Sequence, residues 1–273
     1  MKLLAVAAPF LAAFAAFLPL KSHAQEEQTA VSSQPTSTFV MPKVRQLVVV
    51  TAKTWNTNTG ELQRFESKDG SRWRSIGELI PVNLGRSGLA WGAGLLPPAN
   101  GGRQKKEGDG RSPAGIFPLG TAFGSAKELP DNSRGYPYLA VQSSSYCVED
   151  VRSDFYNQLI DANDVSSKVW HKWSPLSRPD GLFRWGVFVN QNIGPTQVGA
   201  GSCIFLHIWR APGVGTAGCT AMAADSISEL IGWLDSHLKP TLIQLPRDEY
   251  QNLASAHQLP ALNWMTTATA DHS

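Results

Sequence analysis

The chain has 273 residues, of which 42% are hydrophobic and 17% charged, with 24 Gly, 18 Pro and three Cys. This composition is typical of a globular protein and excludes a disordered, collagen-like or disulfide-dense chain. Lys plus Arg number 24 against 22 Asp plus Glu, and residues 1–24 hold two lysines and no acid, so the remainder balances at 22 against 22. A neutral chain argues against electrostatic binding of nucleic acid. Three cysteines form too few disulfides to stabilise a chain of this length, so a buried core must supply most of the stability.

The first 24 residues have the pattern of a secretory signal peptide. Lys2 precedes an uncharged stretch over residues 3–20, and the small side chains of Ser22 and Ala24 suit cleavage before Gln25. The alternative is a retained membrane anchor, for which this stretch has about the minimum length. No other stretch is long and apolar enough to span a bilayer. We therefore expect a secreted or periplasmic protein in an oxidising compartment, without a stable membrane span after cleavage.

The next part of the chain predicts a leader, a hairpin and a loop-rich region. Residues 25–44 are rich in Ser, Thr and Gln and predict a flexible leader. A β-branched run at 47–51 and a candidate return strand at 61–67, separated by a polar turn, predict a β-hairpin. The many Gly and Pro residues over 81–124 predict surface loops around short strands, with a solvated charged loop at 103–111.

Later segments have clearer periodicity. Strand composition occurs at residues 139–142, 185–189, 204–208 and 241–245. Helical spacing occurs at residues 153–160, 223–237 and 247–257. There is no internal repeat and no interior linker. We therefore expect one mainly β domain with a few helices, of the α+β class, over residues 45–250, followed by a C-terminal tail at 251–273.

The residues with the clearest chemical potential lie between His207 and Cys219. His207 falls on a predicted strand, and the Gly-rich loop that follows it ends at Cys219, so the chain can fold back and bring imidazole and thiol together. A thiol needs a base or a positive field to become a reactive thiolate, and His207 is the nearest candidate base. The amides of Gly218 and Cys219 are candidate donors to an oxyanion. The alternative is a core histidine and an unrelated buried cysteine.

This segment resembles the L,D-transpeptidase catalytic-domain family (YkuD-like), whose signature is a strand-borne His, a loop, and then Ser/Thr-x-Gly-Cys. The matching elements here are His207 and Thr-Ala-Gly-Cys at residues 216–219. Residues 111–117 also resemble the family's Thr-Pro-x-Gly-x-Phe strand, which forms a wall of its cleft. The resemblance covers about residues 45–245 and implies a β-sandwich catalytic domain with Cys219 as nucleophile and His207 as base.

The chain departs from the family pattern at two positions near the cysteine. Ala217 stands where the family has His, and Ala221 stands where it has Arg. Arg210 or Arg111 is expected to replace that Arg and to bind a substrate carboxylate in bidentate fashion, while Trp209 is expected to line the groove. The alternatives are ordinary surface salt bridges for the two arginines and a core or lid position for Trp209.

The other two cysteines are expected to form a disulfide. Cys203 and His207 lie four residues apart, which along a strand is about 13 Å, too far to share one metal ion, so no metal site is expected. Cys147 follows a predicted strand and is the expected partner of Cys203 in an oxidising compartment, which leaves Cys219 free. Pairing of Cys219 with Cys147 or with Cys203 is the alternative.

Together, the resemblance implies a secreted cysteine acyltransferase, without a cofactor, that acts on peptidoglycan stem peptides. Cys219 would attack an amide carbonyl, His207 would carry the proton, and the acyl group would pass to an amine of a second stem. Three alternatives remain at this point: an L,D-carboxypeptidase or endopeptidase that passes the acyl group to water, a non-catalytic cell-wall-binding protein, and a cysteine amidase that acts outside the wall.

Overall fold

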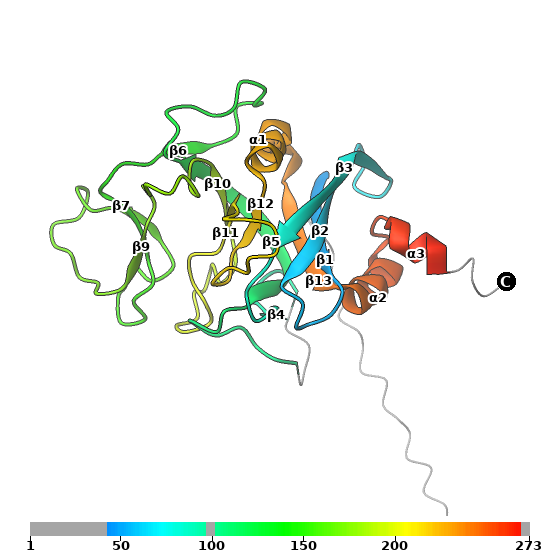
Figure 1. Ribbon diagram of the computed structural model, residues 1–273, viewed down its shortest axis with the longest axis horizontal. Coiled ribbons are helices and arrows are strands. Elements are labelled where there is room, and N and C mark those ends of the chain that lie inside the picture. The colour runs from blue at the N-terminus through cyan, green and yellow to red at the C-terminus, as the bar shows by residue number, and fades with distance from the viewer. Residues whose placement is uncertain (1–42, 97–101, 269–273) are drawn as a thin grey trace, which may run out of the picture. The chain divides into compact units, whose positions relative to one another are not determined.

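The fold is built on one curved sheet, whose strands form a closed ring (Figure 1). The computed structural model describes residues 43–96 and 102–268. In ring order the strands are β1 (Gln46–Ala52), β2 (Thr59–Ser67), β3 (Trp73–Asn83), β12 (Thr220–Met222), β11 (Phe205–Ile208), β10 (Gly186–Val189), β5 (Ser112–Gly124) and β13 (Thr241–Pro246). Two short strands extend this sheet at β5: β4 (Leu89–Trp91) and β6 (Tyr138–Ala140). The fold is mainly β, as expected from the sequence.

The predicted hairpin lies at the centre of the core. β1 pairs antiparallel with β2 and parallel with β13, so it has a neighbour on both edges. All seven of its residues are buried, which explains its continuous β-branched run. The predicted strands at 139–142, 185–189, 204–208 and 241–245 are also present as β6, β10, β11 and β13.

The expectation of surface loops over 81–124 is wrong for β5, which has 13 residues, most of them buried. Its glycines serve close packing rather than turns. A Cβ at Gly124 would lie 2.1 Å from the carbonyl oxygen of Arg184, and one at Gly120 would lie 2.5 Å from the amide oxygen of Asn190. A glycine inside a strand often marks such a close approach, which composition alone does not distinguish from a turn.

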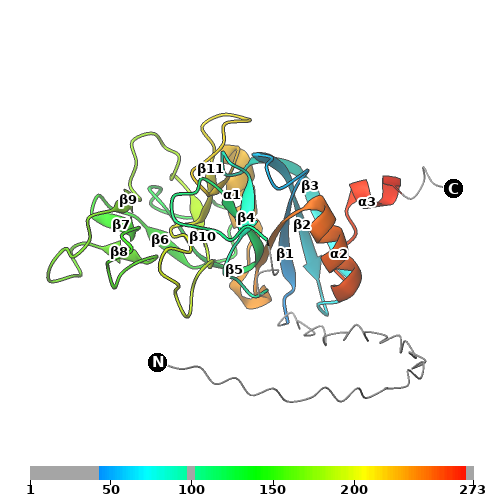
Figure 2. The same ribbon diagram turned by 90° about the horizontal axis from the view of Figure 1, so that it is seen from below.

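Three helices accompany the sheet: α1 (Ala224–Trp233), α2 (Arg247–His257) and α3 (Asn263–Ala268). α2 matches its prediction, and it packs against β13 and β1 (Figure 2). α1 ends earlier than predicted because Leu234 is extended, and a short 3-10 turn at Ser236–Leu238 follows. The prediction of a helix at residues 153–160 is wrong. Turns occupy most of that segment, and the side chains of Asp150 and Ser153 accept backbone N–H bonds that compete with helix formation.

The packed chain extends past both expected limits of the domain. Val44, placed in the leader by its sequence, is 3% exposed in the core. Leu259 and Leu262, placed in the tail, are also buried there, and the Tyr250 hydroxyl donates to the Pro260 carbonyl at 2.8 Å. The predicted signal peptide and most of the leader lie outside the described residues. Within the residues described, no helix is both long and apolar enough to cross a membrane.

A separate three-stranded sheet is tied to the start of β11. It consists of β8 (Leu159–Asp161), β7 (Ser145–Val148) and β9 (Trp173–Pro175). Cys147 of β7 forms a disulfide with Cys203, as expected, and Cys219 is the free cysteine. The side chain of Asn157 adds a second tie, because it accepts from the Cys203 amide at 2.9 Å and donates to the carbonyls of Gln191 and Asn192, both at 3.0 Å. This small sheet is therefore held beside the strand that carries His207.

The thiol count tests this arrangement. The unfolded, unreduced protein should titrate one thiol, and the Cys219→Ala variant should titrate none. The disulfide closes a loop with a sequence separation of 56 residues. By the chain-entropy relation such a loop stabilises the fold by about 4 kcal/mol, so a Cys147→Ala/Cys203→Ala double variant should unfold at clearly lower urea concentration. Three titratable thiols in protein taken from an oxidising compartment would contradict the pairing.

Candidate active site

The pairing of β11 with β12 brings His207 and Cys219 to one face of the sheet. The two strands are parallel, with Leu206 opposite Thr220 and His207 opposite Ala221. Cys219 directly precedes β12 and is therefore level with Phe205. Since side chains alternate between faces, Leu206 and Thr220 point into the core, whereas His207 and Cys219 share the opposite face.

The backbone at Cys219 is held by two hydroxyl groups. The Cys219 carbonyl accepts from Thr216 Oγ1 at 2.6 Å and from Ser112 Oγ at 3.0 Å. Ser112 Oγ in turn accepts from the Gly85 amide at 2.8 Å, which ties the site to the segment after β3. Thr216 Oγ1 also accepts from the Gly218 amide at 3.1 Å. The expectation that this amide is a free oxyanion donor is therefore wrong, because Thr216 occupies it.

His207 is a neutral histidine with a defined tautomer. Its Nδ1 lies 2.7 Å from the Ile208 carbonyl, which accepts only, so Nδ1 carries the proton and Nε2 is left as an acceptor. The ring packs edge-on against Phe183, with centroids 5.1 Å apart. The pKa of His207 is lowered to about 4, chiefly by burial and to a smaller extent by the positive charge of Arg178, against the opposing effects of the hydrogen bond to Ile208 and the charge of Asp180.

Cys219 is partly exposed at the edge of an apolar cluster that includes Phe205, Phe183 and the Cys147–Cys203 disulfide. Its Sγ lies 3.6 Å from the Cys203 carbonyl oxygen. Burial raises the pKa of the thiol to about 12, although a backbone hydrogen bond from Phe205 and the charges of Lys105 and Arg178 act in the opposite direction. At neutral pH the site therefore holds a neutral thiol and a neutral imidazole.

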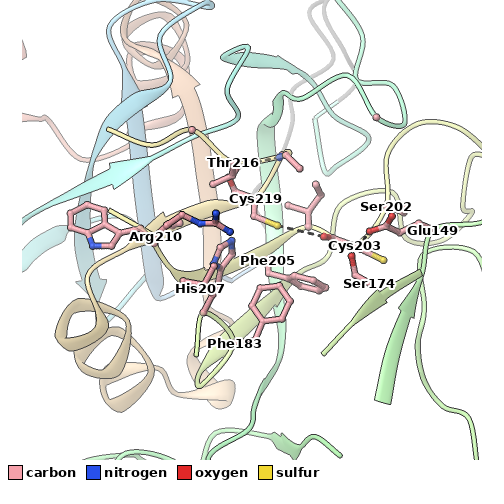
Figure 3. Close-up of a pocket in the computed structure, with 18 of the residues that line it drawn as sticks. Glu149, Ser174, Phe183, Ser202, Cys203, Phe205, His207, Arg210, Thr216 and Cys219 are labelled. Atoms are coloured by element: carbon pink, nitrogen blue, oxygen red, sulfur yellow. Dashed lines mark hydrogen bonds between the residues drawn. The ribbon is translucent and has the colours of Figure 1, made fainter. Parts of the chain in front are cut away.

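Both side chains open into one cavity of about 460 Å³ (Figure 3). Its apolar wall is formed by Phe183, Phe205 and Ile204. Its charged lining residues are Lys105, Glu107, Glu149, Lys172, Arg178 and Arg210. A cavity of this size, with a thiol, an unprotonated imidazole nitrogen and several charged groups, fits a short polar segment of a substrate.

Two of the three predicted substrate-binding residues line this cavity, and the third does not. Arg210 and Trp209 are part of its wall. Arg111 lies outside it, because its guanidinium donates to the carbonyls of Leu89 and Trp55 at 3.0 and 3.3 Å and to the Asn56 side chain. The expectation that Arg111 binds a substrate carboxylate is therefore wrong, since its donors already brace neighbouring backbone segments.

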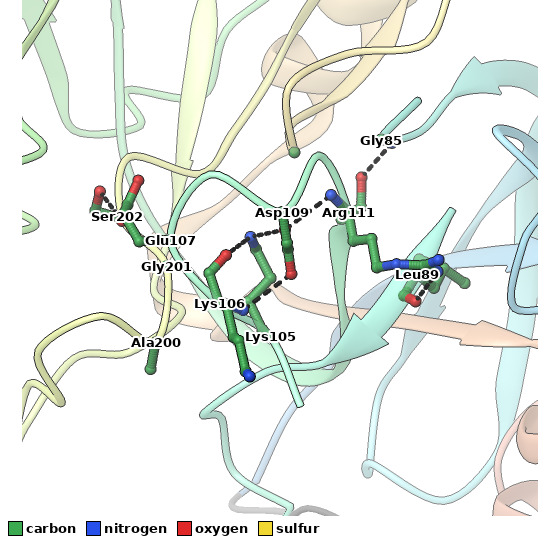
Figure 4. A network of polar contacts seen from close by, with 12 residues as sticks. Gly85, Leu89, Lys105, Lys106, Glu107, Asp109, Arg111, Ala200, Gly201 and Ser202 are labelled. Atoms are coloured by element: carbon green, nitrogen blue, oxygen red, sulfur yellow. Dashed lines mark hydrogen bonds and ion pairs between the residues drawn. The ribbon is translucent and has the colours of Figure 1, made fainter. Parts of the chain in front are cut away.

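The expected solvated loop at 103–111 is a partly buried polar network (Figure 4). Lys105, with only 4% of its side chain exposed, pairs with Asp109 at 2.6 Å. Glu107 accepts from Tyr156 Oη at 2.6 Å and from Ser202 Oγ at 2.7 Å. Charge runs are usually solvated, but Glu107 binds partners that are distant in sequence, so the sequence pattern could not reveal the burial of this loop.

The sequence analysis also missed one side of the cavity. Glu149, Lys172 and Ser174 come from the small sheet and from segments next to it, and Arg178 comes from the loop after β9. None of them lies in a motif. The signal that could have pointed to them is the predicted Cys147–Cys203 disulfide, because it places residues near 147 beside the strand that leads to His207.

Comparisons with known proteins add no further assignment. No family model matches the chain, and neither curated proteins nor solved structures give a match.

The buried His207 should make stability depend on pH. Its folded-state pKa of about 4 lies below the ordinary value of 6.5, so the unfolded chain binds the proton more tightly. The contribution of neutral His207 is fully present above pH 6.5 and is lost as the pH falls from 6.5 towards 4. We expect the unfolding free energy to fall by about 2 to 3 kcal/mol between pH 7.5 and 4.5 on this account.

Urea unfolding at both pH values measures this loss. A His207→Gln variant should lack the His207 part of the pH dependence, whereas His171→Gln, a change at an exposed position, should retain it. If His207→Gln and the parent lose the same free energy on acidification, the buried neutral state of His207 is incorrect.

Proposed function

We propose that the protein is a cysteine acyltransferase that acts on peptidoglycan stem peptides, with the chemistry of an L,D-transpeptidase. The observation that carries the proposal is the placement of Cys219 and His207 on one face of paired parallel strands, both lining one cavity. A nucleophile, a base with a free acceptor nitrogen and a polar pocket are the parts that acyl transfer requires. The substrate class comes from the sequence resemblance over residues 207–219.

The fold supports this proposal at one further place. The strand segment that resembles the family's cleft wall, residues 111–117, forms the start of β5. Ser112, the second residue of that segment, bonds directly to the Cys219 carbonyl. The two segments that carry the resemblance are thus in contact, although 107 residues separate Ser112 from Cys219. We propose on this basis that the domain is YkuD-like.

The reaction begins from the neutral pair. The Cys219 thiol gives its proton to His207 Nε2 as Sγ attacks the carbonyl carbon of the amide bond, and the carbonyl oxygen becomes an oxyanion. The Cys219 amide is the remaining donor of the predicted pair, since Thr216 occupies that of Gly218. Collapse breaks the C–N bond, and the imidazolium returns its proton to the leaving amine. An acceptor amine then attacks the thioester while His207 takes its proton. Collapse of this second intermediate breaks the C–S bond, leaves the new amide and returns the proton from His207 to Cys219 Sγ.

The test of this function is incubation of the mature protein with purified muropeptides, followed by mass spectrometry. The proposal predicts stems joined by a new amide bond, at a rate abolished in Cys219→Ala. Trimmed stems without joined products would instead identify the hydrolytic alternative, an L,D-carboxypeptidase or endopeptidase. Unchanged muropeptides under conditions in which the protein is folded would contradict the proposal.

Loss of the base should be visible in acylation kinetics. The His207→Ala variant should be acylated by a stem peptide or a carbapenem about a hundredfold to ten-thousandfold more slowly than the parent. Because the pKa of His207 is about 4 and that of Cys219 about 12, the parental rate should rise near pH 4 and then stay level through neutral pH. Stopped-flow or mass-resolved acylation between pH 3.5 and 8 measures both effects. A folded His207→Ala protein that reacts at the parental rate would show that another group is the base.

A further inference from the structure

The loop between β11 and β12 forms part of the cavity wall. Trp209, Arg210 and Val214 belong to this loop and line the same cavity as Cys219. Residues 212–214 are exposed to solvent. An exposed loop keeps one shape only where its backbone is tied to the rest of the fold. The bonds that tie this loop therefore determine the shape of the wall.

A buried side chain holds the first half of this loop. Asn83, the last residue of β3, is 1% exposed. Its Nδ2 donates to the Ala211 carbonyl at 2.7 Å, and its Oδ1 accepts from the Gly213 amide at 2.8 Å. The turn bond from the Val214 amide to the Ala211 carbonyl, at 3.3 Å, and the bond from Asn58 Nδ2 to the Gly213 carbonyl, at 3.4 Å, are longer. The amide group of Asn83 thus acts on the loop as a backbone peptide group would.

The second half of the loop is held by backbone groups instead. The Thr216 amide donates to the Leu84 carbonyl, and the Thr216 carbonyl accepts from the Arg86 amide, both at 2.8 Å. The hydroxyl of Thr216 then holds the Cys219 carbonyl. The nucleophile is therefore fixed without the Asn83 side chain, which acts on the part of the loop that comes earlier.

We propose that Asn83 is a positioning residue, whose side chain holds the loop after β11 in the shape that binds a peptide chain beside Cys219. Without this side chain, the Ala211 carbonyl and the Gly213 amide bond to water, and the loop adopts more conformations. A ligand must then order the loop, which weakens its binding. The intrinsic reactivity of the thiol should not change. Assignment of the peptide to a peptidoglycan stem rests on the proposed function, whereas the role of Asn83 does not.

The chain offers a matched control for this side chain. Gln46 of β1 is also fully buried. Its Nε2 donates to the Trp233 carbonyl at 2.9 Å, and its Oε1 accepts from the Asp235 amide at 2.8 Å. Like Asn83, it binds a carbonyl and the amide two residues later, but it does not line the cavity. The variants Asn83→Ala and Gln46→Ala lose the same pair of bonds, so a general loss of stability should affect both.

Hydrogen exchange measured residue by residue tests the tie itself. In Asn83→Ala the Gly213 amide should exchange about tenfold faster than in the parent, because it loses its hydrogen bond. The Thr216 amide should keep its parental rate, since its bond to the Leu84 carbonyl remains. Gln46→Ala should leave both rates unchanged. A Gly213 amide that exchanges at the parental rate in folded Asn83→Ala protein overturns the proposal.

Two neutral alkylating agents test the effect on binding without a peptidoglycan substrate. Iodoacetamide and N-iodoacetyl-dialanine amide each form an S–C bond with Cys219, with loss of the thiol proton and release of iodide, but only the second carries a peptide chain. The ratio of the peptide rate to the iodoacetamide rate, divided by the same ratio for N-acetylcysteine, cancels the reactivity of the thiol. We expect this normalised ratio to exceed one in the parent. It should be about threefold to tenfold lower in Asn83→Ala and parental in Gln46→Ala.

A second variant, Asn83→Asp, decides the matter if Asn83→Ala does not fold. It keeps the size and the acceptor of Asn83 but places a carboxylate oxygen where Nδ2 donated to the Ala211 carbonyl, so it should lower the ratio as well. A parental ratio of one overturns the proposal. A ratio that the folded Asn83 variants leave unchanged, or that Gln46→Ala lowers equally, also overturns it.

These results are independent of the muropeptide assay. A peptide preference that depends on Asn83, in a protein that leaves muropeptides unchanged, supports the positioning role and contradicts the proposed function. Joined stems together with a ratio that does not depend on Asn83 support the proposed function and overturn the positioning role.

Discussion

The parallel pairing of β11 with β12 is the constraint on which the candidate site depends. It fixes the register in which Cys219 lies level with Phe205 and His207 lies level with Ala221. A shift of this register by one residue would turn Cys219 to the opposite face, away from His207. The loop between the strands therefore needs to close in one way. Gly215 allows this, because a Cβ there would lie 2.6 Å from the Cα of Arg86, and the bonds from Thr216 and Ser112 then hold the Cys219 carbonyl.

The small sheet completes the cavity and gives it much of its charge. The disulfide at Cys203 and the Asn157 side chain hold this sheet beside the residues that lead into β11. Glu149 and Lys172 thereby face a nucleophile that is far away in sequence. The same apolar cluster packs behind the thiol and removes water from it, which is the physical cause of its raised pKa. Such a thiol is mostly protonated at neutral pH, so the proposed mechanism requires proton transfer from Cys219 to His207.

The elements that were predicted correctly are those whose own residues show a clear local pattern. The β-branched run of β1, the strand that carries His207 and the helix over Arg247–His257 follow from periodicity and turn residues. Elements determined by long-range packing were missed or misplaced. The composition of β5 is typical of a loop, although its glycines serve close packing. The guanidinium of Arg111 donates to backbone carbonyls, and no sequence spacing identifies those acceptors. Arg178 was missed for the same reason, since only the folded chain brings it to His207.

The central claim is that Cys219, activated by His207, forms a covalent bond to the substrate acyl group. The most direct measurement is rapid acid quenching of a reaction with a stem tetrapeptide, followed by intact-mass analysis and peptide mapping. The account predicts a transient acyl adduct on Cys219 that forms before product and accumulates more slowly in His207→Gln. Product formation without such an adduct, or an adduct on another residue, would contradict it.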